Sequence, residues 1–256
     1  MDMKILGSDY DGTLTHRLGQ ETFDAVTDWQ AAGHKFGIVS GRGVDFSQVI
    51  QEKYPDLGLD FFVGFNGAAI VDGTGKLLYE RRYDGVDPLE LTKTLLNVGC
   101  PFVHVNGDGY YCVVESMEEA PSWVDPSSVC FLEDLPPMKE FTQISIQLPD
   151  MTGSSRVVEY LRQIYGNALN PLQNSGCVDI VAPDVNKAEG LRRVAQYFGA
   201  DTEEIIAVGD NVNDADMIRA FRSYAMETGI DSMKTLAGRT VSTVAELIRS
   251  ELIHNT

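Results

Sequence analysis

Residues 4–13 read KILGSDYDGT, and this stretch decides the fold. A short apolar run ends at Ser8 in an acidic turn that contains Gly12. An apolar run bounded by a turn signal is typical of a buried strand in a parallel sheet. Ligands of such sheets bind at the carboxyl ends of the strands. We therefore expect the first strand to deliver Asp9 and Asp11, whose side chains lean to the same side, to the edge of the sheet where a ligand lies.

Short apolar strands alternate with helical stretches on both sides of a long middle segment. Before it we expect strands at residues 4–8, 36–39 and 61–64, helices at 21–32 and 43–53, and a hairpin of 68–71 with 77–80. After it we expect helices at residues 187–198, 214–221 and 244–253, and strands at 205–208, 223–226 and 239–241. This alternation predicts a parallel sheet with helices on both faces.

The pattern of apolar and polar residues changes near Tyr83. Residues 102–107, 110–116 and 141–148 alternate apolar with polar side chains, which suits an antiparallel sheet with one open face. Helical stretches at 88–98 and 154–165 precede and follow these segments, whereas residues 117–139 give no clear signal. We predict an α/β protein with a doubly wound, mostly parallel, Rossmann-like core sheet and an inserted α+β cap domain. The predicted core is residues 1–82 with 184–256, and the predicted cap is residues 83–183.

The composition narrows the classes of partner. The chain has 20 basic and 38 acidic residues, a net charge of −18, which repels nucleic acid and anionic membranes. We find no apolar run of about 18 residues and no signal-peptide pattern, and the four cysteines show no metal spacing. We therefore expect a cytoplasmic protein, monomeric or homodimeric, with a small molecule as its partner. A phosphorylated partner would need local positive charge or a metal ion.

Polar residues gather where the predicted strands end and where one helix begins. They are Asp9, Asp11, Gly12 and Thr13 after the first strand, Ser40, Gly41 and Arg42 after the second, Lys187 at a helix start, and Asp210, Asn213 and Asp214 after a later strand. Any one of these groups alone is an ordinary turn or helix cap. Their joint appearance, each at a strand end or helix start, indicates a single site.

These residue types suit phosphoryl transfer. One carboxylate of the Asp9 and Asp11 pair can attack phosphorus, while the other protonates the leaving oxygen and then takes a proton from water. The turn at Gly12 and Thr13 presents backbone N–H groups and a hydroxyl to a phosphate, Ser40 offers a donor, and Lys187 balances negative charge. Asp210 with Asp9 forms a hard oxygen site that suits Mg²⁺.

The ordered set of motifs, Asp9-x-Asp11-Gly12-Thr13-Leu14, Ser40-Gly41-Arg42, Lys187 and Gly209-Asp210-x-x-Asn213-Asp214, resembles the haloacid dehalogenase (HAD) superfamily. The stretch Phe65-Asn66-Gly67-Ala68 and the long insert before Lys187 are similar to its Cof-type sugar-phosphatase branch. The motifs span the whole core, whereas the insert is similar only in size and texture.

The resemblance implies a role for each motif residue. Asp9 would be the nucleophile and a Mg²⁺ ligand, and Asp11 the general acid and base, with its backbone carbonyl on the metal. Asp210 would be the third protein ligand, and Asp214 would support the metal site or Lys187. Ser40, Lys187 and Asn213 would bind the phosphoryl group, and Gly41, Arg42 and Asn66 would lie beside the substrate. A carboxylate at position 11 favours hydrolysis, because relatives that keep their aspartyl phosphate carry Thr there.

Three other functions are compatible with parts of the pattern. A phosphomutase of the same fold would return the phosphoryl group to the substrate and need a bisphosphate activator. A receiver-like phospho-switch also uses acidic residues, a Ser or Thr and a Lys, but is about half as long and has no large insert. A binding protein that had lost activity would be expected to lack Asp9, Asp11 or Asp210. A sugar-phosphate-like phosphatase fits the sequence best.

Overall fold

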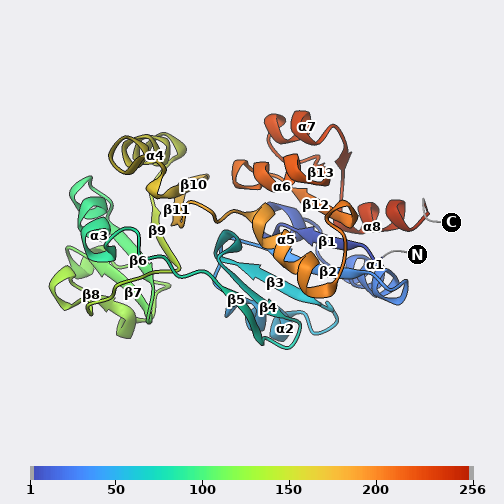
Figure 1. Ribbon diagram of the computed structural model, residues 1–256, viewed down its shortest axis with the longest axis horizontal. Coiled ribbons are helices and arrows are strands. Elements are labelled where there is room, and N and C mark those ends of the chain that lie inside the picture. The colour runs from blue at the N-terminus through green and yellow to red at the C-terminus, as the bar shows by residue number, and fades with distance from the viewer. Residues whose placement is uncertain (1–2, 254–256) are drawn as a thin grey trace. The chain divides into compact units, whose positions relative to one another are not determined.

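The computed structural model describes residues 3–253. Within them the chain forms two compact units, which are described separately (Figure 1). The first unit combines the described residues up to Tyr79 with those from Asn186 onward, and the second is the continuous segment Glu80–Val185. The second unit is therefore an insertion into the first. None of the helices within residues 3–253 is long and apolar enough to cross a membrane.

The first unit is built on an eight-stranded sheet with the order β14-β13-β12-β1-β2-β3-β4-β5. All neighbouring strands from β14 to β3 pair in parallel, and β3 pairs antiparallel with β4. The strands are β1 (Ile5–Ser8), β2 (Lys35–Val39), β3 (Phe61–Gly64), β4 (Ala69–Asp72), β5 (Leu77–Glu80), β12 (Ile205–Gly209), β13 (Arg222–Met226) and β14 (Thr240–Val241). This mostly parallel sheet confirms the predicted fold class.

Helices cover both faces of this sheet. They are α1 (Gln20–Ala31), α2 (Phe46–Lys53), α5 (Lys187–Phe198), α6 (Ala215–Ala220), α7 (Asp231–Ala237) and α8 (Val244–Ile253). Successive residues of a strand point to opposite faces of the sheet and join different apolar cores. Leu6 packs with α1 and α8 on one face, whereas Ile5 packs with α5, α6 and α7 on the other. Both residues are fully buried. Apolar side chains on both faces explain why these strands read as continuous apolar runs.

The inserted unit has a six-stranded sheet with the order β10-β11-β9-β6-β7-β8. Its strands are β6 (Phe102–Asn106), β7 (Tyr110–Val114), β8 (Val129–Cys130), β9 (Gln143–Gln147), β10 (Asn170–Asn174) and β11 (Cys177–Val181), paired antiparallel except for β7 with β8. The helices α3 (Pro88–Asn97) and α4 (Met151–Tyr165) share an apolar core with one face, which includes Val103, Ile144 and Val178. The alternate residues of these strands form the other face.

Several elements lie where the sequence gave no expectation. Residues 117–139 contain short 3-10 turns at Met117–Glu119, Pro126–Ser128 and Leu132–Asp134, together with β8. Two of these turns have local caps, because Ser116 forms a capping box with Glu119 and the Asp125 side chain accepts the Ser127 N–H. The strand β10 and the short helix α7 were not expected either. The predicted helix at 214–221 is a 3-10 turn, Val212–Asp214, followed by α6.

Candidate active site

Asp9 directly follows β1, which lies in the middle of the eight-stranded sheet between β12 and β2. Its backbone N–H donates to the Val208 carbonyl at 2.9 Å, which holds Asp9 against β12. The chain then turns through Tyr10–Leu14, where Gly12 has φ +86°. A side chain there would be strained and would also lie 2.5 Å from the Asp210 carboxylate. Glycine therefore allows the turn to approach the next acidic loop closely.

Lys187 joins two of the predicted acidic residues. Its side chain is fully buried, and its Nζ donates to Asp9 Oδ1 and to Asp214 Oδ1, each at 2.6 Å. Lys187 is the first residue of α5, and the Asn186 side chain caps this helix by accepting the Glu189 N–H at 3.0 Å. The helix start therefore fixes the position from which the lysine reaches both carboxylates.

Asp214 uses both carboxylate oxygens within the protein. Oδ1 accepts from Lys187, and Oδ2 accepts the backbone N–H groups of Asp210 at 2.9 Å and Asn211 at 3.0 Å. Its side chain has no exposed surface. Asp214 therefore ties the loop after β12 to the lysine on α5, and so positions Asp210.

Asp9, Asp210 and Asp214 form the acidic cluster. One oxygen of each lies within 4.8 Å of the others. Thr13 Oγ1 donates to Asp210 Oδ1 at 2.9 Å, so this hydroxyl orients Asp210. Three carboxylates lie close to one ammonium group, which leaves excess negative charge in a largely buried cluster.

The pKa values reflect this excess. Burial, reinforced by the negative charge of Asp214, raises the pKa of Asp9 well above its ordinary value, and Lys187 opposes the shift. Burial also raises the pKa of Asp210. Burial by itself would lower the pKa of Lys187, but Asp214 and Asp9 raise it above its ordinary value, so the ammonium stays charged. A hard divalent cation with oxygen ligands fits this donor set and would balance its charge.

The Asp11 side chain is not part of the acidic cluster but pairs with Arg42. The strand ends at Ser8 and Gly12 turns the chain, so the period of a strand no longer applies. The Asp11 side chain is 48% exposed, and both of its oxygens accept from Arg42, at 2.8 Å from Nε and 2.9 Å from Nη2. The Gly12 N–H donates to Thr15 Oγ1 at 3.0 Å.

The loops after β2 and β3 are bonded to each other. Ser40 is buried, its Oγ accepts the Arg42 N–H at 3.2 Å, and its carbonyl accepts the Asn66 N–H at 2.9 Å. Asn66 is fully buried in the left-handed region with φ +54°. Gly41 lies between Ser40 and Arg42, and Asn213 is buried in the turn after β12, next to Asp214. The predicted site residues thus follow four neighbouring strands, β12, β1, β2 and β3, with Lys187 reaching in from α5.

The pairing of Asp11 with Arg42 is the feature of the site that sequence reasoning missed. Both residues had been predicted as site residues, but with separate roles. The available signal was topological, because Asp11 follows β1, Arg42 follows β2, and these strands are neighbours. Spacing along the chain gives no indication of it.

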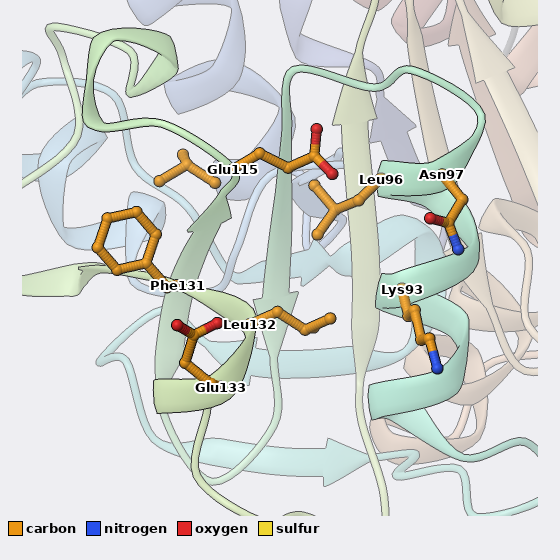
Figure 2. Close-up of a pocket in the computed structure, with 8 residues that line it drawn as sticks. Lys93, Leu96, Asn97, Glu115, Phe131, Leu132 and Glu133 are labelled. Carbon is orange, nitrogen blue, oxygen red and sulfur yellow. The ribbon is translucent and has the colours of Figure 1, made fainter.

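A hollow of about 450 Å³ in the inserted unit contains none of the predicted site residues. Figure 2 shows Lys93, Leu96 and Asn97 along α3, with Leu132 and Glu133 on the turn opposite. Its charged lining is one lysine against Glu115 and Glu133, which does not favour a phosphate. The predicted chemistry therefore belongs to the network around Lys187.

Comparisons with known proteins agree with this geometry. The family model for haloacid dehalogenase-like hydrolase matches residues 6–246. The chain is 26% identical over 244 residues to the Escherichia coli 5-amino-6-(5-phospho-D-ribitylamino)uracil phosphatase YbjI, covering 89% of this chain and 86% of that protein. A second match is YitU from Bacillus subtilis, which is also named as a 5-amino-6-(5-phospho-D-ribitylamino)uracil phosphatase. The identity is 41% over 70 residues, and the matched segment covers 27% of this chain and 26% of YitU.

Solved structures have the same fold over nearly the whole chain. A putative HAD/COF-like hydrolase from Plasmodium vivax superposes with a TM-score of 0.82 at 22% identity, covering 98% of this chain and 96% of that one. The HAD subclass IIB sugar phosphatase BT4131 superposes with a TM-score of 0.77 at 18% identity, covering 98% and 100%. These findings confirm the resemblance inferred from the motifs. The chain belongs to the haloacid dehalogenase-like hydrolases, and its fold is that of the Cof-like, subclass IIB members of the family.

Proposed function

We propose that this hydrolase is a Mg²⁺-dependent phosphatase that transfers the phosphoryl group of a small phosphorylated metabolite to Asp9 and then to water. The observation that carries the proposal is the buried ion network in which Lys187 holds Asp9 and Asp214 at 2.6 Å, next to Asp210. A carboxylate held at a strand end by a buried cation is placed for attack on an electrophile.

The proposed reaction has two steps. In the first, an Asp9 carboxylate oxygen bonds to phosphorus, the bond from phosphorus to the leaving oxygen breaks, and protonated Asp11 gives its proton to that oxygen. In the second, water attacks phosphorus, ionised Asp11 takes a proton from the water, and the Asp9 carboxylate is released with inorganic phosphate. Each step restores the form of Asp11 that the other needs.

The acidic cluster fits the proposed metal. Asp9 and Asp210 would hold Mg²⁺ with the backbone carbonyl of Asp11, and the bound ion would offset the repulsion between an anionic nucleophile and an anionic phosphate. Asp214 supports this site without binding the ion directly in our proposal, because both of its oxygens already accept hydrogen bonds from the protein. Thr13 orients Asp210 through its hydroxyl.

Other residues of the network are proposed to bind the phosphoryl group and the substrate. Lys187 balances the charge of the transferring group, and Ser40 supplies a hydroxyl beside it. The backbone of the Gly12 and Thr13 turn and the Asn213 side chain complete the phosphate contacts in this proposal. Gly41, Arg42 and Asn66 lie on the bonded loops after β2 and β3, so they are proposed to border the substrate.

The proposed substrate class is a sugar phosphate or a phosphorylated sugar alcohol. The names of the Escherichia coli and Bacillus subtilis relatives specify a substrate with a phosphoribityl chain. We propose that the inserted unit is a cap that contacts the part of the substrate beyond the phosphate. Its sheet face opposite α3 and α4 carries the partly exposed Ser145 and Asp179, which lie opposite each other on β9 and β11. Such a polar row suits the hydroxyl groups of a sugar.

The test is phosphate release from sugar phosphates, phosphorylated sugar alcohols and nucleotides, with and without Mg²⁺. Asp9→Asn should lose more than about 10³-fold in rate while remaining folded, since it removes the nucleophile. Asp216→Asn is the matched control, because Asp216 lies at the surface, where it pairs with Arg219. Near-normal turnover by the Asp9 variant would eliminate the covalent mechanism. Release that requires a bisphosphate activator would indicate a mutase instead.

A further inference from the structure

Arg42 forms a two-point hydrogen-bonded ion pair with Asp11, a contact that a residue bordering the substrate does not require. Its Nε donates to Asp11 Oδ2 at 2.8 Å and its Nη2 to Asp11 Oδ1 at 2.9 Å. Two parallel hydrogen bonds of this kind are stronger and more directional than a single ion contact. They also occupy both oxygens of Asp11, so the carboxylate has one defined orientation.

The guanidinium is itself held in place, although the Arg42 side chain is 47% exposed. It lies over the Phe46 ring, 4.4 Å from the centroid, and 5.9 Å from the centroid of the Tyr10 ring. The Arg42 backbone donates to Ser40 Oγ at 3.2 Å and accepts the Phe65 N–H at 2.9 Å. An arginine fixed at its backbone and over two rings loses little further freedom when it binds a carboxylate.

Both oxygens of Asp11 accept from Arg42, so in this arrangement the carboxylate is placed to accept a hydrogen and has none to donate. In the proposed reaction this form of Asp11 exists after the leaving group has departed and before water attacks. The pair with Arg42 therefore corresponds to the state in which Asp11 acts as a base.

We propose that Arg42 is a positioning residue for the second step, in which its two-point contact holds the Asp11 carboxylate in one orientation while water attacks. This inference rests on the proposed function. It separates Arg42 from the phosphate-binding residues, because its effect passes through Asp11.

The experiment measures the two steps separately, using acetyl phosphate labelled with ³²P in the presence of Mg²⁺. Acetate leaves without needing a proton, so formation of labelled Asp9 does not depend on Asp11 as an acid. After rapid mixing, the labelled enzyme is trapped in acid to give the formation rate. A chase with unlabelled acetyl phosphate then gives the rate at which the label is lost to water.

Arg42→Gln should slow the loss of label by about 10-fold to 100-fold, a part of what a general base contributes, and change its formation by less than about 3-fold. Arg42→Lys should recover little of this rate, because one ammonium cannot make the paired contact. In an Asp11→Asn background, Arg42→Gln should add no further defect in the loss of label. Arg219→Gln, which alters an exposed pair with Asp216, is the control and should match the wild type.

Three results would overturn the inference. Loss of label at the wild-type rate in Arg42→Gln would show that Arg42 does not serve the second step. Slower formation with unchanged loss would assign Arg42 to phosphate binding. An added defect in the Asp11→Asn background would show that Arg42 acts independently of Asp11. Failure of the wild type to acquire label at all would instead refute the proposed function.

Discussion

Replacing Lys187 with methionine should destabilise the first unit and abolish turnover. Methionine keeps much of the length of the side chain but removes the charge that lies 2.6 Å from both Asp9 and Asp214. At an effective dielectric constant of about 20, opposite unit charges at 2.6 Å attract by about 6 kcal/mol. Desolvation of the buried ions offsets much of this attraction.

The net loss of stability in Lys187→Met follows from the buried carboxylates that remain in the variant. Two buried carboxylates would face each other with no cation between them, and removing one partner of a buried ion pair costs about 3–5 kcal/mol. The pKa of Asp9 would rise further without Lys187, since the lysine opposes the effects of burial and of Asp214. A higher pKa lowers the fraction of Asp9 that is ionised and able to attack phosphorus.

The assay is urea unfolding at pH 7.5 in a Trp123→Phe background, where fluorescence reports on Trp29, which is buried in the first unit. The control is Lys234→Met, because Lys234 pairs with the fully exposed Asp231 and should lose less than about 1 kcal/mol. Adding Asp9→Asn to Lys187→Met should recover part of the stability. A loss below about 1 kcal/mol for Lys187→Met, or an equal loss for both lysines, would refute the electrostatic reasoning.

Two further predictions concern the metal and pH. Mg²⁺ at about 100 times its dissociation constant should stabilise the wild type by about 2.7 kcal/mol. In thermal melts, Asp210→Asn should lose most of this stabilisation, whereas Asp216→Asn should keep it. Equal stabilisation of both variants would show that Asp210 does not bind the metal. Burial lowers the pKa of His104 from 6.5 to about 4, so as the pH falls this residue is protonated in the unfolded chain before it is protonated in the folded one. Through this group, the free energy of unfolding of the inserted unit should fall by about 2.5 kcal/mol between pH 7.5 and pH 4.5. His104→Gln should show correspondingly less acid sensitivity in urea unfolding followed by Trp123 fluorescence in a Trp29→Phe background, and an unchanged sensitivity would contradict the assignment.

The core of the fold could be predicted because its signals are local. The strand at residues 61–64 has the bounds expected, and so have the helices at 187–198 and 244–253. Each strand of the central sheet is a short apolar run followed by polar residues, and topology alone then brings those polar residues to one edge. Trp29, Phe36, Phe61 and Phe62 lie in these periodic segments and are buried, while Phe221 is only partly buried.

The elements that were missed depend on partners distant in the sequence. Strand β10 reads NPLQN and has little intrinsic preference for a strand. It pairs only with β11 at the edge of its sheet, where Pro171 is tolerated because no further strand requires its missing N–H. Helix α7 has seven residues, of which only Met233 is buried, so it carries no apolar period.

The details of the site are equally non-local. Sequence reasoning could collect Asp9, Asp11 and Arg42 at one edge, but it could not assign their partners. The bend at Gly12 sends Asp11 to Arg42 while Asp9 meets Lys187, and both pairs join residues far apart in the chain. Such pairings follow from backbone direction at a single turn, which residue types do not encode.

The central position of β1 has a consequence for the order in which the protein matures during synthesis. Ile5 pairs with Lys35 of β2 on one side and with Ile205 of β12 on the other. Strand β1 therefore gains its second neighbour only when β12, which is synthesised much later, has emerged. The inserted unit is continuous in sequence and leaves the ribosome in between, so it can fold first. The carboxylate cluster forms only after residues 205–214 have emerged. Hydrolytic capacity is therefore a late acquisition of the growing chain, and nascent fragments that end before this segment carry none.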